Sequence, residues 1–440
     1  MTEDILREVL SRVKPSPLEE ERLRATVKRI IATLNATAKS DGIDAYAIHV
    51  GSTARDTWLR GTKDLDIFLM FPPDAAADAL ENAGLDLARS LSTEFEERYA
   101  EHPYVTARYE DLDVDLVPCY NVPDPAHIIS AVDRSPFHNR YVQSHINGMS
   151  DEVRLLKQFT RGTGVYGSEL KTQGFSGYLC ELLIIKYGSF MEAIKHGASL
   201  RQGKVIDIEG HMDRSVEHPD PLIVIDPVDP RRNVAAALSE QKFCEFMDAC
   251  RRFLKGPSIE FFFPAEPAPM GSEDMKGLMS RRGTLLISIV FQAPDIVEDT
   301  LYPQLRKAEE SVVRLLERSE FKVYRSGVWS GDKSAILVEM LVWRLPCVER
   351  HWGPPVQERE HCEKFKEKYP DAYVMGGKLA VDLPRRHTAA ASLIEAQLTS
   401  CGLGKQVARS IAEGFALLYN EDALTLGPGF ASYLPGFLCP

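Results

Sequence analysis

The sequence lacks the features that mark membrane-spanning, secreted and zinc-binding proteins. No apolar run in its 440 residues approaches the roughly 18 to 20 residues that cross a bilayer. The N-terminal segment MTEDILREVLSRVKP is charged and amphipathic, without the apolar stretch and cleavage site of a signal peptide. The eight cysteines lie far apart, with no C-x-x-C pair, and so indicate neither a zinc site nor a disulfide framework. We therefore expect a cytoplasmic protein with reduced thiols.

An excess of positive charge is also missing. The chain has 52 Lys and Arg against 64 Asp and Glu, a net charge of −12. This balance argues against nucleic-acid binding by bulk electrostatic attraction, although binding depends on local patches and not on the total. The sequence contains no repeat and no low-complexity stretch. At about 150 residues per domain, its length predicts about three globular domains.

Helical and strand patterns alternate in the first 144 residues. Apolar positions recur at helical spacing over residues 3–40, which predicts a helical segment. Runs of β-branched and apolar residues between turn signals predict strands. The expected elements that follow are strands over 45–50 and 64–71, helices over 53–59 and 76–98, and a hairpin of 104–109 with 112–117 that ends at Pro118.

Long helical patterns dominate after about residue 145. The expected helices cover 152–160, 178–194, 303–318, 357–368 and 405–419, and the expected strands cover 222–226 and 284–291. Weaker strand patterns lie at 322–324 and 335–343. Breaks at Pro257 and in the proline-rich stretch 264–270 predict a domain boundary there.

The segment most informative about chemistry is the acidic strand that begins at Asp64. Side chains two apart on a strand point to the same face, so Asp64 and Asp66 lie side by side, about 6.6 Å apart at Cα. The hairpin brings a third acidic position, Asp115, if its strand lies beside the first. Asp113 shares the face of Asp115, but it stands at the start of its strand, where a solvated acid is common. The pattern predicts a cluster of three carboxylates.

Such a cluster favours a metal site over a bare group of charges. Two like charges about 4 Å apart repel by roughly 4 kcal/mol at an effective dielectric of 20. A divalent cation between the carboxylates makes the net interaction attractive, and Mg²⁺ binds through a few carboxylates together with substrate phosphates. Upstream, Gly51 permits close backbone approach to an anion, and Arg55 can add charge against a triphosphate. The alternative is a set of solvated edge-strand carboxylates.

The segment HVGSTARDTWLRGTKDLDIFLMFP (49–72) resembles the nucleotidyltransferase motif of the polymerase-β superfamily. Further segments are similar to archaeal-type (class I) CCA-adding enzymes in particular, from about residue 46 to 308, and the similarity is faint beyond about residue 310. These segments are AEHPYV (100–105), VDLVPCY (114–120), SAVDRSPFHNRY (130–141), EVRLLKQF (152–159), GFSGYLCELL (174–183), IDPVDPRRNVAAALS (225–239) and DTLYPQLRKA (299–308).

The resemblance implies an α/β multidomain protein. Its parts would be a polymerase-β-like nucleotidyltransferase head over 1–144, a helical central domain over 145–257, an α/β body over 258–308 and 386–440, and an inserted tail over 309–385. The implied reaction is attack by a tRNA 3′-hydroxyl on the α-phosphate of CTP, twice, and then of ATP, with release of pyrophosphate and no template. The implied partners are the tRNA acceptor stem and 3′ end, CTP and ATP, with no membrane; a homodimer is one option for the assembly.

The resemblance also implies the roles of individual residues. Asp64, Asp66 and Asp115 match the catalytic metal ligands, for two Mg²⁺ ions. The matching nucleotide-binding positions are Ser52, Arg55, His138, Lys157, Tyr166 and Arg232.

Interpretations without a functional role stay open for four of these positions. Lys157 can be a solvated lysine and Tyr166 a packed side chain at a domain junction. His138 can be a loop histidine whose hydrogen bonds are satisfied locally, and Arg232 can be part of an exposed pair with Arg231.

Three other functions are alternatives. Another superfamily nucleotidyltransferase, such as a poly(A) polymerase or an oligoadenylate synthetase, shares the GFSGYLCELL type of segment. A non-catalytic RNA-binding relative would retain the fold, but three intact carboxylates argue against it. A metal-dependent phosphodiesterase would use the carboxylates, but the Gly51-Ser52 pair favours nucleotide transfer over hydrolysis.

Overall fold

The computed structural model of the protein describes residues 2–99 and 103–439, so the first three residues of the AEHPYV segment lie outside the described residues. The chain forms two compact units, Met1–Ala265 and Glu266–Pro440, which divide within the proline-rich stretch 264–270. Within the described ranges, no helix is both long and apolar enough to cross a membrane.

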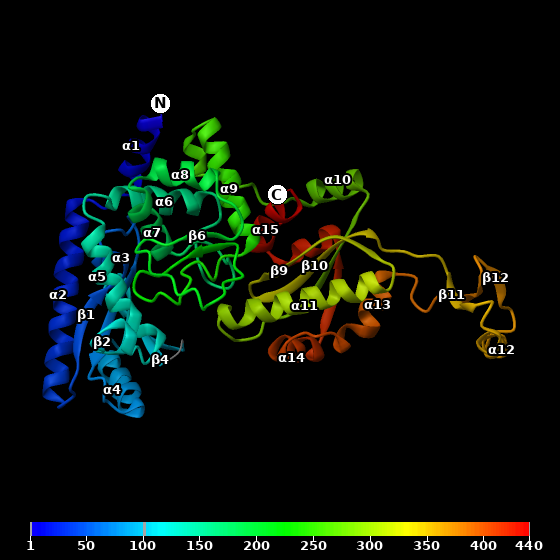
Figure 1. The fold of residues 1–440 in the computed structure, drawn as a ribbon, viewed down its shortest axis with the longest axis horizontal. Helices are drawn as coiled ribbons and strands as arrows, with labels where there is room; N and C mark the ends of the chain where they lie inside the picture. The colour runs from blue at the N-terminus through cyan, green and yellow to red at the C-terminus, as the bar shows by residue number, and fades with distance from the viewer. Residues whose placement is uncertain (1, 100–102, 440) are drawn as a thin grey trace. The chain divides into compact units, whose positions relative to one another are not determined.

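The first unit contains a five-stranded sheet of order β1-β2-β5-β4-β3, of which β1, β2 and β4 are labelled in Figure 1. β2 and β5 run parallel, and the other neighbours run antiparallel. The predicted strands at 45–50 and 64–71 and the predicted hairpin are confirmed. The strands are β1 (Tyr46–Val50), β2 (Asp64–Phe71), β3 (Phe95–Tyr99), β4 (Pro103–Tyr109) and β5 (Leu112–Tyr120).

Helices α2 (Pro17–Ser40) and α4 (Ala77–Arg89) cover one face of this sheet. Alternation along β2 sends Leu65 and Ile67 into the core beneath them, where both are buried. The alternate positions, including Asp66, point to the opposite face. The carboxylates therefore lie on the side of the sheet that α2 and α4 leave uncovered.

The helical segment predicted over 3–40 is two helices, α1 (Thr2–Val13) and α2. Ser16 separates them and caps α2, because its hydroxyl accepts the Glu19 N–H while the Glu19 carboxylate accepts the Ser16 N–H. This reciprocal capping box satisfies two backbone donors at the start of the helix.

Two predictions at element ends are wrong. The helix expected over 76–98 stops at Arg89, and strand β3 follows. The strand expected to end at Pro118 continues to Tyr120. Pairing between β4 and β5 ends at Leu116, so β5 is an edge on that side, where a residue without an N–H is tolerated.

The rest of the first unit is mainly helical, around a cluster of buried phenylalanines that includes Phe159, Phe190 and Phe253. The helix predicted over 178–194 is wrong in its middle, because Gly188 adopts φ +82° and ends the first of two helices. The helices are α5 (Ser135–His145), α6 (Ser150–Gly162), α7 (Gly177–Tyr187), α8 (Phe190–Ala198) and α9 (Glu240–Lys255), with strands β6 (Lys204–Ile206) and β7 (Leu222–Val224).

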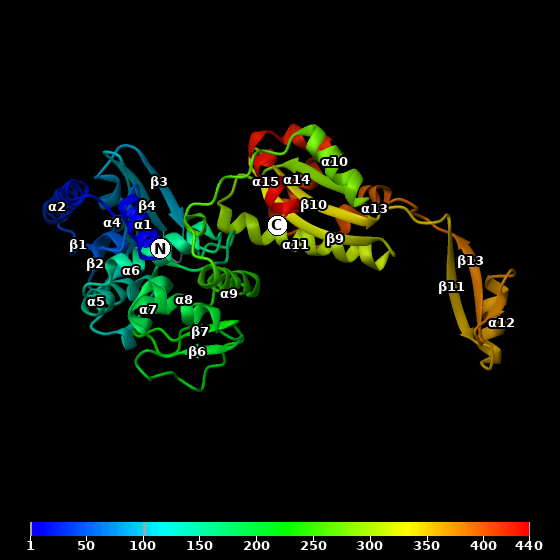
Figure 2. The ribbon, with the colours of Figure 1, turned by 90° about the horizontal axis from the view of Figure 1, so that it is seen from above.

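The second unit contains a four-stranded sheet of order β14-β8-β10-β9, with α11 along β9 and β10 (Figure 2). The helix predicted over 405–419 is wrong beyond Glu413, because Gly414 at φ +149° ends it and strand β14 follows. The strands are β8 (Leu285–Gln292), β9 (Lys322–Ser330), β10 (Lys333–Val342) and β14 (Phe415–Tyr419). The helices are α10 (Ser272–Arg282), α11 (Glu298–Arg318), α13 (Ala390–Gln397), α14 (Lys405–Glu413) and α15 (Pro428–Leu438).

A separate three-stranded sheet of order β11-β13-β12 lies between β10 and α13 in the sequence. Its strands are β11 (Val348–Pro355), β12 (Tyr373–Met375) and β13 (Lys378–Pro384), and it carries helix α12 (Arg359–Lys368). Strands β9 and β10, whose residues lie within the segment predicted as a tail over 309–385, are part of the four-stranded sheet. The predicted domain limits stay predictions.

Candidate active site

The parallel pairing of β2 and β5 brings four carboxylates onto one face of the sheet. Asp64 lies opposite Asp113, and Asp66 lies opposite Asp115. Thr106 of β4 donates its hydroxyl to Asp115 Oδ1 at 2.6 Å, so the neighbouring strand orients that carboxylate. The three aspartates expected to act together are therefore neighbours on one surface.

Burial makes the charged forms of Asp66 and Asp115 unfavourable. Burial and the charges of Asp115 and Asp64 raise the pKa of Asp66 to about 6, although Arg55 opposes the rise. Burial also raises the pKa of Asp115 despite the hydrogen bond from Thr106. Both carboxylates are thus harder to ionise than ordinary aspartates, and a bound cation would relieve the penalty.

Asp113 behaves differently from its neighbours. Its carboxylate lies 2.6 Å from Arg108 Nη1, and both side chains are about 40% exposed. This ion pair at the edge of the cluster explains the presence of Asp113 without assigning it a catalytic role.

The backbone turn after β1 touches the carboxylates directly. Gly51 adopts φ +81°, and a Cβ at this position would lie 1.9 Å from Asp66 Oδ2. Only glycine permits that approach. The helix predicted over 53–59 is wrong: the helical turn α3 covers Gly51–Ala54, and Arg55 is its C-terminal cap. Ser52 is half-buried in this turn.

The carboxylates border two hollows. Asp64, Asp113 and Asp115 line one of about 380 Å³, together with Arg98. Asp66 lines another of about 190 Å³, which also borders Gly51, Arg55, Ser135, His138 and Tyr178.

The carboxylates do not form a closed cage. Among the described residues, no three His, Cys, Asp or Glu side chains stand ready to hold an ion. The oxygen donors nevertheless fit Mg²⁺, which usually takes one or two carboxylates and completes its shell with water and substrate phosphates.

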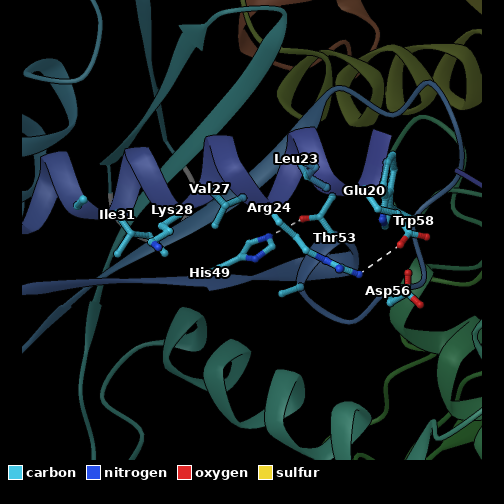
Figure 3. A pocket seen from close by; sticks show the side chains of 12 residues that line it. Glu20, Leu23, Arg24, Val27, Lys28, Ile31, His49, Thr53, Asp56 and Trp58 are labelled. Carbon is cyan, nitrogen blue, oxygen red and sulfur yellow. Dashed lines mark hydrogen bonds and ion pairs between the residues drawn. The ribbon is translucent and has the colours of Figure 1, made fainter. Parts of the chain in front are cut away.

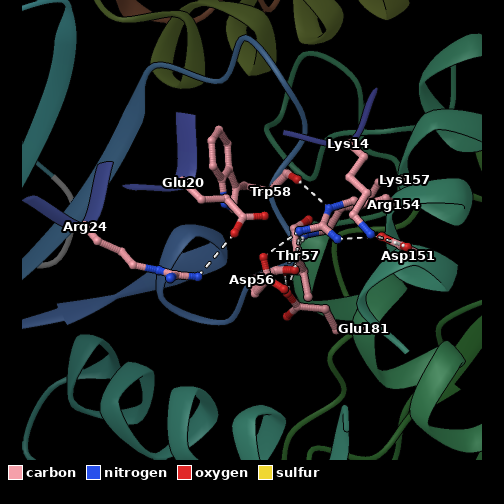
Figure 4. A network of polar contacts seen from close by, with 10 residues as sticks. All are labelled: Lys14, Glu20, Arg24, Asp56, Thr57, Trp58, Asp151, Arg154, Lys157 and Glu181. Carbon is pink, nitrogen blue, oxygen red and sulfur yellow. Dashed lines mark hydrogen bonds and ion pairs between the residues drawn. The ribbon is translucent and has the colours of Figure 1, made fainter. Parts of the chain in front are cut away.

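A second buried carboxylate, Glu181 of α7, connects the turn after α3 to the helices of the first unit (Figure 4). Glu181 has no exposed surface; it accepts the Thr57 hydroxyl and pairs with Arg55 and Lys157. Burial would raise the pKa of Glu181, but Arg55 and Lys157 outweigh it and hold that pKa below its usual value. Arg55 thus lies in the hollow of Asp66 with its charge already paired.

Lys157 lies behind the site and not in it. Its Nζ donates to the Thr57 carbonyl at 3.0 Å and to the Thr57 hydroxyl at 3.1 Å, and the residue is 2% exposed. Burial lowers the pKa of Lys157, while Glu181 opposes the fall. The interpretation of Lys157 as a solvated lysine is therefore wrong.

Tyr166 is half-buried and lies under the Arg161 guanidinium, which is 4.8 Å from its ring centroid. Burial raises the pKa of Tyr166 to about 12. A Cβ on Gly177 would come within 3.1 Å of the Tyr166 hydroxyl, so this helix start packs closely against it. Tyr166 borders neither of the hollows that the carboxylates line.

His138 and Arg232 meet at Asp226, in the loop after β7. Both approach Asp226 Oδ2 to 2.8 Å, and the His138 ring stacks on Tyr178 with centroids 4.2 Å apart. His138 and Tyr178 also line a hollow of about 510 Å³ with Arg232, next to that of Asp66. Arg231 points elsewhere; it is 72% exposed and lies 3.6 Å from an Asp213 oxygen.

Sequence reasoning missed both buried carboxylates. Glu181 is the one acidic residue in the apolar segment GYLCELLIIKY, and Asp226 directly follows the apolar run LIVI. An isolated acid in an apolar run is costly to bury unless it is paired, so both positions carried a detectable signal.

A larger hollow of about 580 Å³ lies behind the α3 turn, between α2 and β1 (Figure 3). His49 lies here with its Nε2 2.8 Å from the Thr53 hydroxyl. Burial and the charge of Arg55 lower the pKa of His49 to about 4, so the ring is neutral near pH 7. None of the clustered aspartates lines this hollow.

Three family models match successive parts of the chain. The nucleotidyltransferase domain matches residues 30–138, the second domain of tRNA nucleotidyltransferase matches 151–263, and the C-terminal domain of the CCA-adding enzyme matches 282–420. The last match extends the resemblance well beyond residue 310, where we expected it to fade.

Curated relatives match over nearly the whole chain. The CCA-adding enzyme of Methanosarcina barkeri is 48% identical over 96% of this chain and 95% of its own length. That of Methanothermobacter thermautotrophicus is 41% identical over 98% and 97%, and that of Halobacterium salinarum is 40% identical over 99% and 98%. The expected α/β fold with a polymerase-β-like nucleotidyltransferase head is confirmed, and the chain belongs to the CCA-adding enzyme family.

Proposed function

We propose that the protein adds C, C and A in turn to the 3′ end of tRNA. The RNA 3′-hydroxyl attacks the α-phosphate of CTP twice and of ATP once, pyrophosphate leaves each time, and no nucleic-acid template takes part. The observation that carries this proposal is the parallel pairing of Asp64 and Asp66 with the strand of Asp115, on an open sheet face beside Gly51. Because tRNA and nucleoside triphosphates are cytoplasmic, we place the activity there.

Asp64, Asp66 and Asp115 are proposed to hold the divalent ions, with Mg²⁺ as the metal. Proteins with this nucleotidyltransferase head normally use divalent ions, and the raised pKa values of Asp66 and Asp115 mean that a bound cation would relieve an unfavourable charge at these carboxylates. Two Mg²⁺ ions would supply charge stabilisation for the attacking and leaving oxygens. Asp64, Asp66 and Asp115 are the side chains that would hold these ions.

The nucleotide-facing residues are proposed to act in two groups. Ser52 and Arg55 are proposed to border the triphosphate, because Arg55 lines the hollow of Asp66 and Ser52 lies in the turn α3 that Arg55 caps. His138 and Arg232 are proposed to border the base, because both line the adjoining hollow. Lys157 is proposed to act from behind, by holding the carbonyl and hydroxyl of Thr57.

Tyr166 is likewise proposed to support the nucleotide site from behind. Its hydroxyl lies within 3.1 Å of a Cβ position on Gly177, where α7 begins, and the next residue of that helix is Tyr178.

Extension of a tRNA that lacks its 3′ CCA tests the proposal. We expect CTP alone to add two nucleotides, CTP with ATP to add three, and ATP alone to add none. Growth of a long tail with ATP would support a poly(A) polymerase instead. Absence of any product with the purified, folded protein and Mg²⁺ would refute the proposal.

A further inference from the structure

A single buried carboxylate, Asp226, holds three side chains that line the hollow of about 510 Å³, namely His138, Tyr178 and Arg232. Its side chain has no exposed surface, yet it receives four polar contacts. His138 Nε2 and Arg232 Nη1 each lie 2.8 Å from Oδ2. The Tyr178 hydroxyl donates to Oδ1 at 3.3 Å, and the Val228 N–H donates to Oδ1 at 3.0 Å. Both oxygens are therefore fully used.

The partners of Asp226 come from three separate segments and form one wall. His138 lies on α5, Tyr178 on α7, and Arg232 in the loop after β7. His138 and Tyr178 stack on each other and line both adjoining hollows, of which the smaller contains Asp66. A nucleotide with its phosphates at Asp66 and its base in the larger hollow would pass His138 and Tyr178 on the way to Arg232.

Asp226 remains charged at the pH of the cell. Burial opposes its ionisation, but the hydrogen bond and charge of His138, the Val228 N–H and Arg232 lower its pKa to about 2. A permanently charged, fully buried carboxylate fixes its partners more firmly than a neutral acceptor would, because charge-assisted hydrogen bonds are about twice as strong.

The guanidinium of Arg232 is held at one nitrogen, and Arg232 lines the hollow. Its side chain is 40% exposed, and within the described part of the chain its hydrogen bonds go to Asp226 alone. Cytosine and adenine carry an amine beside an unprotonated ring nitrogen, whereas uracil and guanine carry a carbonyl beside a ring N–H. An N–H donor fixed opposite the ring nitrogen therefore fits the first pair and meets another donor in the second.

We propose that Asp226 is a positioning residue for nucleotide selection, which orients the Arg232 guanidinium so that cytosine and adenine fit while uracil and guanine do not. This inference rests on the proposed function and deepens it. Asp226 itself touches no substrate, because it is fully enclosed; it acts through Arg232, and through His138 and Tyr178, which keep the wall in place.

The substitution Asp226→Asn tests the inference, since it preserves size and removes the charge. One amide oxygen cannot accept from both His138 and Arg232 with the strength of a carboxylate. We expect KM for CTP and ATP to rise about tenfold. The preference for CTP and ATP over UTP and GTP should fall by about tenfold or more, because a misplaced Arg232 guanidinium no longer rejects the wrong base. A purely structural role would lower kcat or stability and leave that preference unchanged.

The measurement is single-nucleotide extension with each of the four nucleoside triphosphates. The RNAs are tRNAs that end before the first C, before the second C and before the A, and kcat and KM are determined separately. The double variant of Asp226→Asn with Arg232→Ala should lose no more preference than Arg232→Ala alone, because both changes act through one guanidinium. Additive losses would overturn the inference.

A matched control lies in the neighbouring pair. Asp213 faces the exposed Arg231 at 3.6 Å, so Asp213→Asn also removes an aspartate beside an arginine. We expect wild-type KM and preference for this control; the same loss as in Asp226→Asn would overturn the inference.

If Asp226→Asn does not fold, the variant Arg232→Lys is measured in its place. Lysine keeps the positive charge beside Asp226 but lacks the planar set of N–H donors of the guanidinium. Arg232→Lys should then lose preference in the same way. If a folded Asp226→Asn or Arg232→Lys protein keeps the wild-type preference for CTP and ATP over UTP and GTP, the role of Asp226 is overturned. The proposed function stands in that case, because the wild-type protein still extends tRNA. Failure of the wild-type protein to extend any of the RNAs overturns the proposed function itself.

Discussion

Replacing Asp66 by asparagine should stabilise the metal-free protein and abolish nucleotide transfer. The rise of the Asp66 pKa from its ordinary 3.8 to about 6 means that the folded state disfavours its charge. At about 1.4 kcal/mol for each pKa unit, the penalty at neutral pH is about 3 kcal/mol. The asparagine side chain keeps the shape without the charge, so we expect a gain in the free energy of unfolding of up to about 3 kcal/mol in the presence of a chelator.

The pH dependence of this gain follows from the direction of the pKa change. Above pH 6 the carboxylate is charged in both the folded and the unfolded protein, and the full penalty is present. As the pH falls through 6, the folded protein takes up a proton first, and below about pH 4 both states are protonated. The gain from Asp66→Asn should therefore be largest near pH 7.5, fall to about half at pH 5 and vanish below pH 4.

Urea-induced unfolding in the presence of a chelator measures the gain, and tRNA extension with Mg²⁺ measures transfer, which should fall on the order of 10³-fold or more. The matched control is Asp113→Asn, because the half-exposed pair of Asp113 with Arg108 is worth only about 0–1 kcal/mol. The control should be slightly destabilised and should retain transfer. A metal-free Asp66→Asn protein no more stable than wild type would refute the argument from repelling carboxylates, and wild-type turnover would refute the assignment of Asp66.

Three further predictions concern the base, the RNA and the buried network. Arg232→Ala should slow extension with both CTP and ATP and admit UTP or GTP, whereas Arg231→Ala should have little effect; equal effects in single-nucleotide extension would contradict the assignment. tRNA affinity should fall steeply between low and physiological salt despite the net charge of −12, because each phosphate contact releases counterions, and a flat salt titration would argue against tRNA as the substrate. Glu181→Ala should destabilise the protein by about 3–5 kcal/mol in urea unfolding, because Lys157 and Arg55 lose their buried counter-charge, and a loss below about 1 kcal/mol would show that they find other partners.

Local pattern was a reliable guide wherever one segment determines its own conformation. The period of two over 64–71 predicted strand β2 at its observed limits and placed Leu65 in the core and Asp66 on the other face. The same alternation predicted the hairpin that carries Asp115. Predictions failed at element ends such as 53–59 and 405–419, where a helical pattern of apolar residues continues past the point at which the backbone turns.

The sequence by itself determined the family and the acidic strand. Each of these is a property of consecutive residues and their side-chain period. Only the tertiary structure decided that Asp66 lies beside Asp115, because parallel pairing joins strands that the chain brings together only after α4 and β3. It alone decided that Lys157 is buried and that Asp226 meets His138, 88 residues away. Such contacts depend on how helices and strands pack over long separations, and no local periodicity encodes them.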